Sequence, residues 1–194
     1  NDTEVITKDW IESLLQYAQL PHVGAVGCKL LYPTNHLQHA GVVLGVGGSG
    51  ETPGVAAHMF PNYNDQHVTD FAQNLYVGGV RNFSAVTAAC IMVSVDKFKK
   101  VKGFNDAFQI AWNDVDFCMK LVSAGWFNVY TPFAKLYHHE SISVGHPGSE
   151  SRDLGVFKKE IYLFGKTWGW DYIANDPYYS PHFRKDIANA RIKP

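Results

Sequence analysis

Apolar and polar positions along the chain divide it into segments that predict helices and strands in turn. Between Lys8 and Gln19 the apolar residues recur at helical spacing, and Pro21 ends the pattern. The face that this helix is expected to bury consists of five residues: Trp10, Ile11, Leu14, Leu15 and Ala18. The next stretch, VGAVGCKLLYP, is almost continuously apolar, so it predicts a buried strand whose glycines leave room for close approach of another segment.

The middle of the chain predicts two more strands around a long irregular region. AGVVLGVGGSG, which begins at Ala40, predicts a strand that runs into a glycine-rich loop. No amphipathic helix follows these glycines, so a flexible loop is favoured over a phosphate-binding loop. Residues 51–82 are rich in Asn, Pro, His, Gly and Tyr without a clear period, which predicts a long loop with a functional role. SAVTAACIMVSV, residues 84–95, predicts a fully buried strand.

The C-terminal half continues the alternation. DKFKKVKGF predicts a short helix that ends at Gly103, and residues 114–124 predict a second helix that ends at Gly125. WFNVYTP and KLYHHES each predict a short strand, and residues 151–167 predict an amphipathic helix before an irregular tail. Strands that alternate with helices predict a single α/β domain over residues 1–194.

Composition restricts the classes of protein to consider. A hydrophobic fraction of 46% and an aromatic fraction of 14% favour a packed core over disorder. The net charge of −1 offers no broad basic surface, so nucleic acid is not an expected partner. No apolar run approaches the length of a membrane span. The cysteines Cys28, Cys90 and Cys118 all stand in apolar contexts, and we interpret them as reduced core residues of a cytoplasmic protein.

Two carboxylates stand at the start of the helix predicted over residues 114–124, in the sequence NDVD. Acids in the first turn stabilise a helix by capping it and by opposing its dipole, and this structural interpretation covers both Asp114 and Asp116. The other interpretation is that one of them acts in catalysis. Residues two positions apart lie about 200° apart around a helix, so only one of them can face a given cleft.

The stretch YHHES contains two adjacent histidines. Neighbouring residues of a strand point to opposite faces, so at most one of His138 and His139 can bind a given metal ion. The alternative is that both are hydrogen-bonded histidines with a structural role. Asp2, in NDTEV, is on composition alone a solvated residue at the start of the chain.

Eight motifs follow one another along the chain: NDTEV, VGAVGCKLLYP, LQHAGVVLG, SAVTAACIMV, GFNDAF, WNDVDFCMKL, AGWFNVYTPFAKLYHHES and the tail DPYYSPHF. In this order they resemble the family 2 glycosyltransferases, inverting enzymes of the GT-A fold, and in particular the bacterial polysaccharide and O-antigen branch. The resemblance implies the C-terminal, acceptor-side part of a GT-A (nucleotide-diphospho-sugar transferase) fold, an α/β domain with a mixed sheet flanked by helices. In the family a nucleotide-binding half precedes the NDT motif, so we expect this chain to be part of a larger protein. We expect the metal motif at residues 1–3, the acceptor and catalytic half at 84–143, and the C-terminal helix and tail at 150–194.

The resemblance also implies roles for individual residues. Asp2 matches the aspartate that binds a divalent cation, Mn²⁺ or Mg²⁺, on the donor diphosphate, and His138 matches a histidine that adds a metal ligand in many members. Asp114 matches the general base, while Asn113 stands where a glutamate is usual. The residues expected to contact substrate are Trp112, Asn113, Asp116, Thr87 and His139. Trp112 either stacks on an acceptor sugar or packs in the core.

The chemistry of an inverting transfer is consistent with these roles. Negative charge grows on the leaving diphosphate, and a cation held by Asp2 and His138 would stabilise that charge as a Lewis acid. The acceptor hydroxyl loses its proton as it attacks. Asp114 at a helix N-terminus would stay ionised and could take that proton.

The expected function is therefore transfer of a sugar from a nucleotide-diphosphate donor to a saccharide or lipid-linked saccharide acceptor in cell-surface polysaccharide synthesis. The alternative is a non-catalytic carbohydrate-binding or assembly module, whereas a metal-dependent hydrolase would need a tighter ligand cluster such as HExxH, which the sequence lacks. We expect a cytoplasmic location at the inner face of the plasma membrane, with peripheral membrane association of the whole protein. The chain alone is expected to be inactive and to self-associate through an exposed sheet edge.

Overall fold

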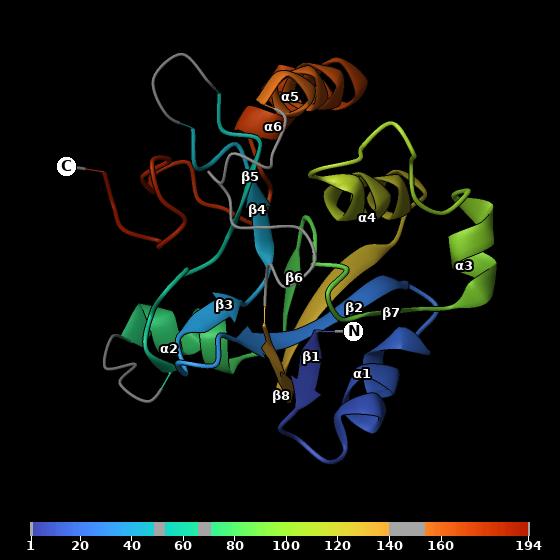
Figure 1. Ribbon diagram of the computed structural model, residues 1–194, viewed down its shortest axis with the longest axis vertical. Helices are drawn as coiled ribbons and strands as arrows, with labels where there is room; N and C mark the ends of the chain where they lie inside the picture. The colour runs from blue at the N-terminus through green and yellow to red at the C-terminus, as the bar shows by residue number, and fades with distance from the viewer. Residues whose placement is uncertain (1, 49–52, 66–70, 140–153, 194) are drawn as a thin grey trace.

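Two long parallel strands form the centre of the sheet in the computed structural model (Figure 1). They are β2 (Val23–Leu31) and β8 (Phe127–His138). The ranges that the structure describes are residues 2–48, 53–65, 71–139 and 154–193.

Four short strands pair antiparallel with the central two and complete a sheet that has six strands within the described residues. β1 (Thr3–Val5) and β6 (Arg81–Phe83) pair with β8, whereas β3 (Leu37–His39) and β7 (Ile91–Val93) pair with β2. One parallel pair among antiparallel ones makes the sheet mixed, which confirms the expected fold class.

Helices cover both faces of this sheet. α1 (Trp10–Ala18) packs on one face and α4 (Asn113–Ser123) on the other (Figure 1). β2 alternates accordingly, because successive strand residues point to opposite faces. Val26 and Cys28 belong to the core beneath α1, and Ala25 belongs to the core beneath α4.

The remaining elements lie around this central layer. β4 (Val42–Leu44) and β5 (Ala56–His58) pair with each other and lie between the main sheet and the C-terminal helices (Figure 1). The other helices are α2 (Phe71–Gly78), α3 (Val95–Lys100), α5 (Leu154–Trp168) and α6 (Trp170–Ala174). Across the described ranges, none of the helices has both the length and the apolar character needed to cross a bilayer.

The close approach expected at the strand glycines occurs at Gly27 of β2. A Cβ built there would lie 2.5 Å from the Cβ of Val86, well inside van der Waals contact. Only glycine lets the segment around Val86 lie directly on the sheet.

The predicted helix ends are confirmed for α3 and α4. Gly125 follows α4 with a φ of 92°, whereas both Lys102 and Gly103 follow α3 with a φ of 62°. This left-handed conformation carries no steric penalty for glycine and stops a helix.

The face that α1 buries is narrower than predicted. Leu14 and Ala18 are buried, but Ile11 and Leu15 are 49% and 48% exposed. The helix contacts β2, β7 and β8 through Leu14 and Ala18, and its neighbouring apolar positions remain at the surface.

The prediction of one long loop over residues 51–82 is also wrong. The described part of this region contains β5, α2 and the start of β6. β5 is a strand because it pairs with β4, and a pairing between separate segments leaves no period in three residues. Residues 51–52 and 66–70 of the predicted loop, and residues 49–50 of the glycine-rich segment, lie outside the described ranges.

Residues 84–95 do not form the single buried strand that was expected. Only β7 is a strand, and its residues are half-buried. Ser84 to Val86 are buried, and residues 88–90 then turn. Backbone bonds with Val42 hold Ala85 to β4 instead of to the main sheet.

The two strands predicted at WFNVYTP and KLYHHES are one strand, β8. Its pairing with β2 shifts between Cys28, opposite Thr131, and Lys29, opposite Lys135. Pro132 lies in this bulge, where the missing N–H of proline costs no ladder bond. The C-terminal helix predicted over residues 151–167 is α5, and residues 151–153 lie outside the described ranges.

Candidate active site

A cleft of about 450 Å³ lies beside the N-terminus of α4, bordered by the β4–β5 pair, the loop before α4, and α5. Figure 1 shows these elements arranged around one region of the molecule. Part of its lining is apolar and aromatic and consists of Val42, Ile110, Trp112 and Phe157. The polar residues of the lining are His58, Asn113 and Asp114. Its size and its mixed lining are typical of small-molecule sites.

Asp114 lies in the first turn of α4, with its carboxylate on the cleft. One oxygen accepts a hydrogen bond from the backbone N–H of Ala88 at 3.1 Å, and the other from the N–H of Val115 at 2.8 Å. A carboxylate has about four acceptor positions. These two bonds therefore orient the group and leave lone pairs for a substrate.

Asp116 points away from this cleft, so only one of the two acids faces it, as the helical spacing requires. Its side chain is 1% exposed and accepts a hydrogen bond from the indole N–H of Trp168 at 3.0 Å. Lys120 lies 3.4 Å from its second oxygen. The expectation of direct substrate contact is corrected here, because these contacts bury the carboxylate and use it to fasten α5 onto α4.

Trp112 adopts the left-handed conformation, with φ of 57°, at the residue before α4. Its ring packs on that of Phe157, with centroids 4.9 Å apart. Trp112 is half-buried, so one part of it packs against the core while another lines the cleft, and stacking on a sugar stays a prediction. A non-glycine residue in this conformation is strained and is commonly found near functional sites.

Of the predicted substrate contacts Asn113 and Thr87, one lines the cleft and the other does not. Asn113 is exposed and lines it. Thr87 does not line it, although it adjoins Ala88, which binds Asp114. The Thr87 hydroxyl accepts from the N–H of Ala89 at 3.4 Å and so supports this turn.

Glu160 holds the loop that carries the cleft wall, and the sequence did not reveal this role. The side chain is buried on α5 and accepts hydrogen bonds from three consecutive backbone N–H groups. The donors are Gln109 at 2.6 Å, Ile110 at 2.9 Å and Ala111 at 2.9 Å. Three donors around one carboxylate determine the path of the loop directly before Trp112.

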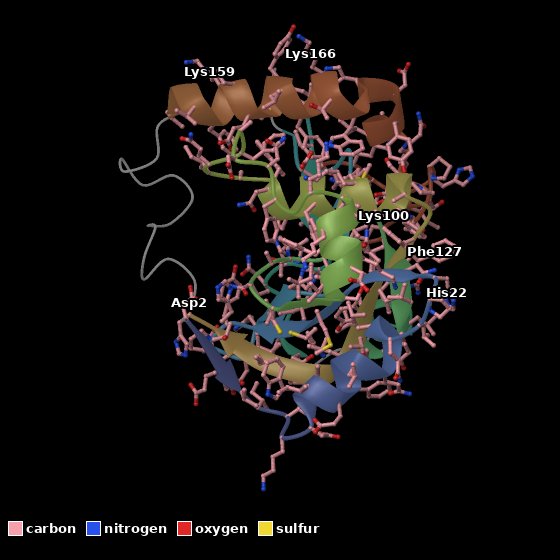
Figure 2. All side chains as sticks on the ribbon, turned by 90° about the vertical axis from the view of Figure 1, so that its right-hand side faces the viewer. Asp2, His22, Lys100, Phe127, Lys159 and Lys166 are labelled. Atoms are coloured by element: carbon pink, nitrogen blue, oxygen red, sulfur yellow. The ribbon has the colours of Figure 1, made fainter. Side chains whose placement is uncertain are left out.

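Asp2 and His138 come together at the edge of the main sheet, as the metal hypothesis requires. Asp2 Oδ2 lies 3.3 Å from His138 Nε2, because Thr3 of β1 is paired with His138 of β8. Figure 2 shows Asp2 at the sheet edge, below α4 and α5 in that view. Neither residue lines the cleft that contains Asp114.

The orientation of His138 fits a metal ligand. Its Nδ1 donates to Gln38 Oε1 at 2.7 Å, so Nε2 is the ring nitrogen that faces Asp2. Two acceptor atoms this close require a cation between them, either a proton or a metal ion. Two adjacent ligands, each about 2.1 Å from an octahedral ion, lie about 3 Å apart. The described residues contain no group of three or more His, Cys, Asp or Glu side chains placed to bind a metal, so Asp2 and His138 could supply only part of a coordination shell.

His139 has a separate partner. Its Nε2 lies 3.4 Å from Glu4 Oε2, and both side chains are substantially exposed. Its backbone N–H donates to the carbonyl of Asp2 at 2.8 Å. The structure thus gives His139 a place beside the Asp2–His138 pair and none in the cleft.

Similarity to known proteins adds an independent line of comparison. The chain is 40% identical to an uncharacterized protein of Sinorhizobium fredii over 183 residues, which are 94% of this chain and 19% of that protein. It is 35% identical to the O-antigen biosynthesis protein RfbC of Myxococcus xanthus over 195 aligned residues, which are 100% of this chain and 14% of that protein.

A third relative matches a shorter segment. The N-acetylglucosaminyl-diphospho-decaprenol L-rhamnosyltransferase of Mycobacterium tuberculosis is 33% identical over 88 residues, 44% of this chain and 28% of that enzyme. No protein-family model matches the chain. Among the three relatives described, two have functional names, an O-antigen biosynthesis protein and a rhamnosyltransferase. The chain spans less than a fifth of the length of the first two relatives.

Proposed function

We propose that this chain is the acceptor-side part of an inverting family 2 glycosyltransferase that moves a sugar from a nucleotide-diphosphate donor to a saccharide or lipid-linked saccharide. The process would be cell-surface polysaccharide synthesis in the cytoplasm. The observation that carries the proposal is the oriented carboxylate of Asp114 on a cleft with an aromatic wall. The names of two relatives, an O-antigen biosynthesis protein and a rhamnosyltransferase, support the same class of reaction.

In this proposal Asp114 is the general base. Its backbone partners leave acceptor positions that can receive the proton of an acceptor hydroxyl. The carboxylate lies in the first turn of α4, at the positive end of the helix dipole. The aromatic wall formed by Trp112 and Phe157 would bind the apolar face of a sugar ring and exclude water from it.

Asp2 and His138 would hold a Mn²⁺ or Mg²⁺ ion together with the donor diphosphate. Carboxylate, imidazole and phosphate oxygens suit such an ion, which commonly takes its other ligands from substrate and water. Bound there, the cation would neutralise charge on the leaving diphosphate. Gln38 would keep the ligating nitrogen of His138 unprotonated.

Asp114→Asn in the intact protein tests the role of the base. We expect turnover to fall by about 10²-fold or more with donor affinity nearly unchanged, since general-base catalysis contributes about 10²–10⁴. The amide preserves shape and loses one of the two backbone hydrogen bonds, so thermal stability should change little. Initial rates with a nucleotide sugar and a saccharide acceptor measure the effect.

Asp106→Asn is the matched control, because Asp106 is an exposed acid in the same region of the chain. Asp116→Asn would be a poor control, since that carboxylate is buried against Trp168. Unchanged turnover in Asp114→Asn would reduce Asp114 to a helix-stabilising acid. A protein that binds saccharides but never transfers sugar, with or without Asp114, would instead be the non-catalytic module.

The metal role is tested with His138→Ala and His139→Ala. The first change should raise the Mn²⁺ concentration for half-maximal activity on the order of 10-fold or more, and excess metal should restore part of the activity. His139→Ala should leave the metal requirement unchanged, because its ring contacts Glu4 and not Asp2. A metal titration in which both variants behave like the wild type would contradict ligation by His138.

A further inference from the structure

A buried histidine connects the interior of the protein to the cleft. His39 on β3 is fully buried, and its Nδ1 lies 2.8 Å from Nδ1 of His58 on β5. The two rings meet edge to face, with centroids 5.0 Å apart. His58 is one of the residues that line the cleft containing Asp114.

The positions of the protons in this pair follow from a third group. The backbone N–H of Thr87 donates to Nε2 of His39 at 3.5 Å, and a backbone N–H can only donate. Nε2 of His39 is therefore an acceptor, so the ring proton of His39 is on Nδ1. That proton occupies the short contact with His58, and Nδ1 of His58 must accept it. His58 is consequently neutral, with its own proton on Nε2.

The surroundings of His39 agree with this arrangement. Burial holds the pKa of His39 well below its ordinary value, and the neighbouring rings of His58 and His138 lower the pKa further. A second proton on His39 would lie in a closed interior beside two other imidazoles. His39 is thus a permanent neutral donor at neutral pH, and its orientation is set by contacts on both sides of the ring.

The cleft then has a hydrogen-bond acceptor on α4 and a hydrogen-bond donor on β5. Asp114 on α4 is a hydrogen-bond acceptor, whereas His58 on β5 brings an N–H donor and cannot compete as a base while Nε2 holds its proton. We propose that His58 binds the acceptor saccharide, donating from Nε2 to a hydroxyl next to the one that Asp114 deprotonates. His39 is the positioning residue that keeps His58 in this tautomer. The proposal rests on the glycosyl transfer proposed above and extends it to recognition of the acceptor.

This arrangement selects a chemical class of acceptor. The substrate needs one hydroxyl to give its proton to Asp114 and a second oxygen nearby to accept from His58. A neighbouring pair of hydroxyls on a sugar ring meets this need, and the less polar face of the same ring can lie on Trp112 and Phe157. A simple alcohol can satisfy only Asp114.

The tautomers can be measured directly on ¹⁵N-labelled protein by imidazole ¹⁵N–¹H correlation near neutral pH. We expect a protonated Nδ1 in His39 and a protonated Nε2 in His58, with the resonances assigned from spectra of His39→Asn and His58→Gln. A proton on Nδ1 of His58, or on both of its nitrogens, would overturn the inference whatever the reaction of the protein is.

A saccharide titration of the same sample separates the inference from the proposed function. The probes are the methyl glycosides of N-acetylglucosamine, glucose, galactose, mannose and rhamnose. The inference expects any glycoside that shifts the Trp112 indole N–H to shift Nε2 of His58 as well. Shifts at Trp112 without shifts at His58 would overturn the inference and leave the proposed acceptor site intact. A panel that shifts neither residue would overturn both.

Kinetics of the intact protein test the role in binding. His58→Ala should raise the acceptor KM about 3- to 10-fold with kcat less affected, the size of one neutral hydrogen bond. His58→Gln keeps an N–H near the position of Nε2 and should recover part of this loss. His39→Asn retains a donor near the position of Nδ1 and should stay close to wild type, while His39→Leu should behave like His58→Ala. Equal KM values in all four variants would overturn the inference.

Discussion

The thermal stability of the protein should depend on Glu160, whose carboxylate holds the loop beside the cleft although it lies far from Asp114 in sequence. Its buried carboxylate accepts from the N–H groups of Gln109, Ile110 and Ala111, at 2.6 to 2.9 Å. Glu160→Gln keeps the volume of the side chain but replaces one oxygen by an NH₂ group. That group would face the N–H of Ala111, a donor against a donor.

The expected cost follows from the three bonds. A hydrogen bond to a charged group contributes about 1.5–3 kcal/mol and a neutral one about 0.5–1.5 kcal/mol. Glu160→Gln removes one charged bond and weakens the other two. Water can reach part of the loop, since Gln109 is exposed, so the loss should be about 2–4 kcal/mol. For a chain of this length, Tm changes by about 2–4 °C per kcal/mol, which gives a decrease of about 4–16 °C.

Thermal unfolding followed by circular dichroism or calorimetry at one pH measures this effect. Glu12→Gln is the matched control, because Glu12 is an exposed acid of α1, and its free energy of unfolding should stay within about 0.5 kcal/mol of wild type. Should Glu160→Gln unfold at the same temperature as Glu12→Gln, the three hydrogen bonds would not determine the stability of this loop.

Two further predictions concern the sheet. Burial opposes the ionisation of Asp65, but its ion pairs with two lysines outweigh this and hold its pKa below 3.8. Asp65→Asn should therefore lower the free energy of unfolding by about 3 kcal/mol near neutral pH, as expected for a broken buried ion pair. This difference from wild type should shrink as the pH falls below about 3.8, because the carboxylate of the wild type is then protonated. Urea unfolding at a series of pH values measures both effects. Gly27→Ala should cost about 1–3 kcal/mol because the added methyl meets Val86, whereas Gly78→Ala, with open space around it, should not destabilise.

The helices α3 and α4 were predicted closely from the sequence because their signals are local, whereas α2 falls in a region predicted as a loop. α3 and α4 end before Gly103 and Gly125, and both glycines adopt the left-handed conformation that ends a helix. The strand β2 was also predicted, since nine consecutive buried residues leave a long apolar run. In each case the determining interactions lie within one short segment.

Strands that depend on a distant partner were predicted poorly. β5 is three residues long and exists because β4 pairs with it. The bulge at Pro132 joins two segments of β8 that the sequence separates. A run of three residues carries no period of its own, so its structure follows from its partner.

The candidate site divides in the same way. The sequence placed Asp114 at the start of a helix, and the resemblance to glycosyltransferases brought Asp2 and His138 together as a pair. It did not reveal that Asp116 is buried against Trp168. Nor did it reveal His58, whose only sequence signal is its place in a region with many histidines and no period.

The sequence by itself determined the alternation of helices and strands, the helix ends and the acid at the start of α4, because spacing, glycines and first-turn acids act over a few residues. Only the tertiary structure decided which side chains share the cleft. Glu160 reaches back about fifty residues to hold the loop before Trp112, with contacts that span 49 to 51 positions. His39 and His58 lie 19 positions apart and meet because the pairing of β4 with β5 places His58 opposite Val42, three positions after His39. The physical reason is that burial and hydrogen bonding between distant segments exist only once the chain has folded, so no local pattern records them.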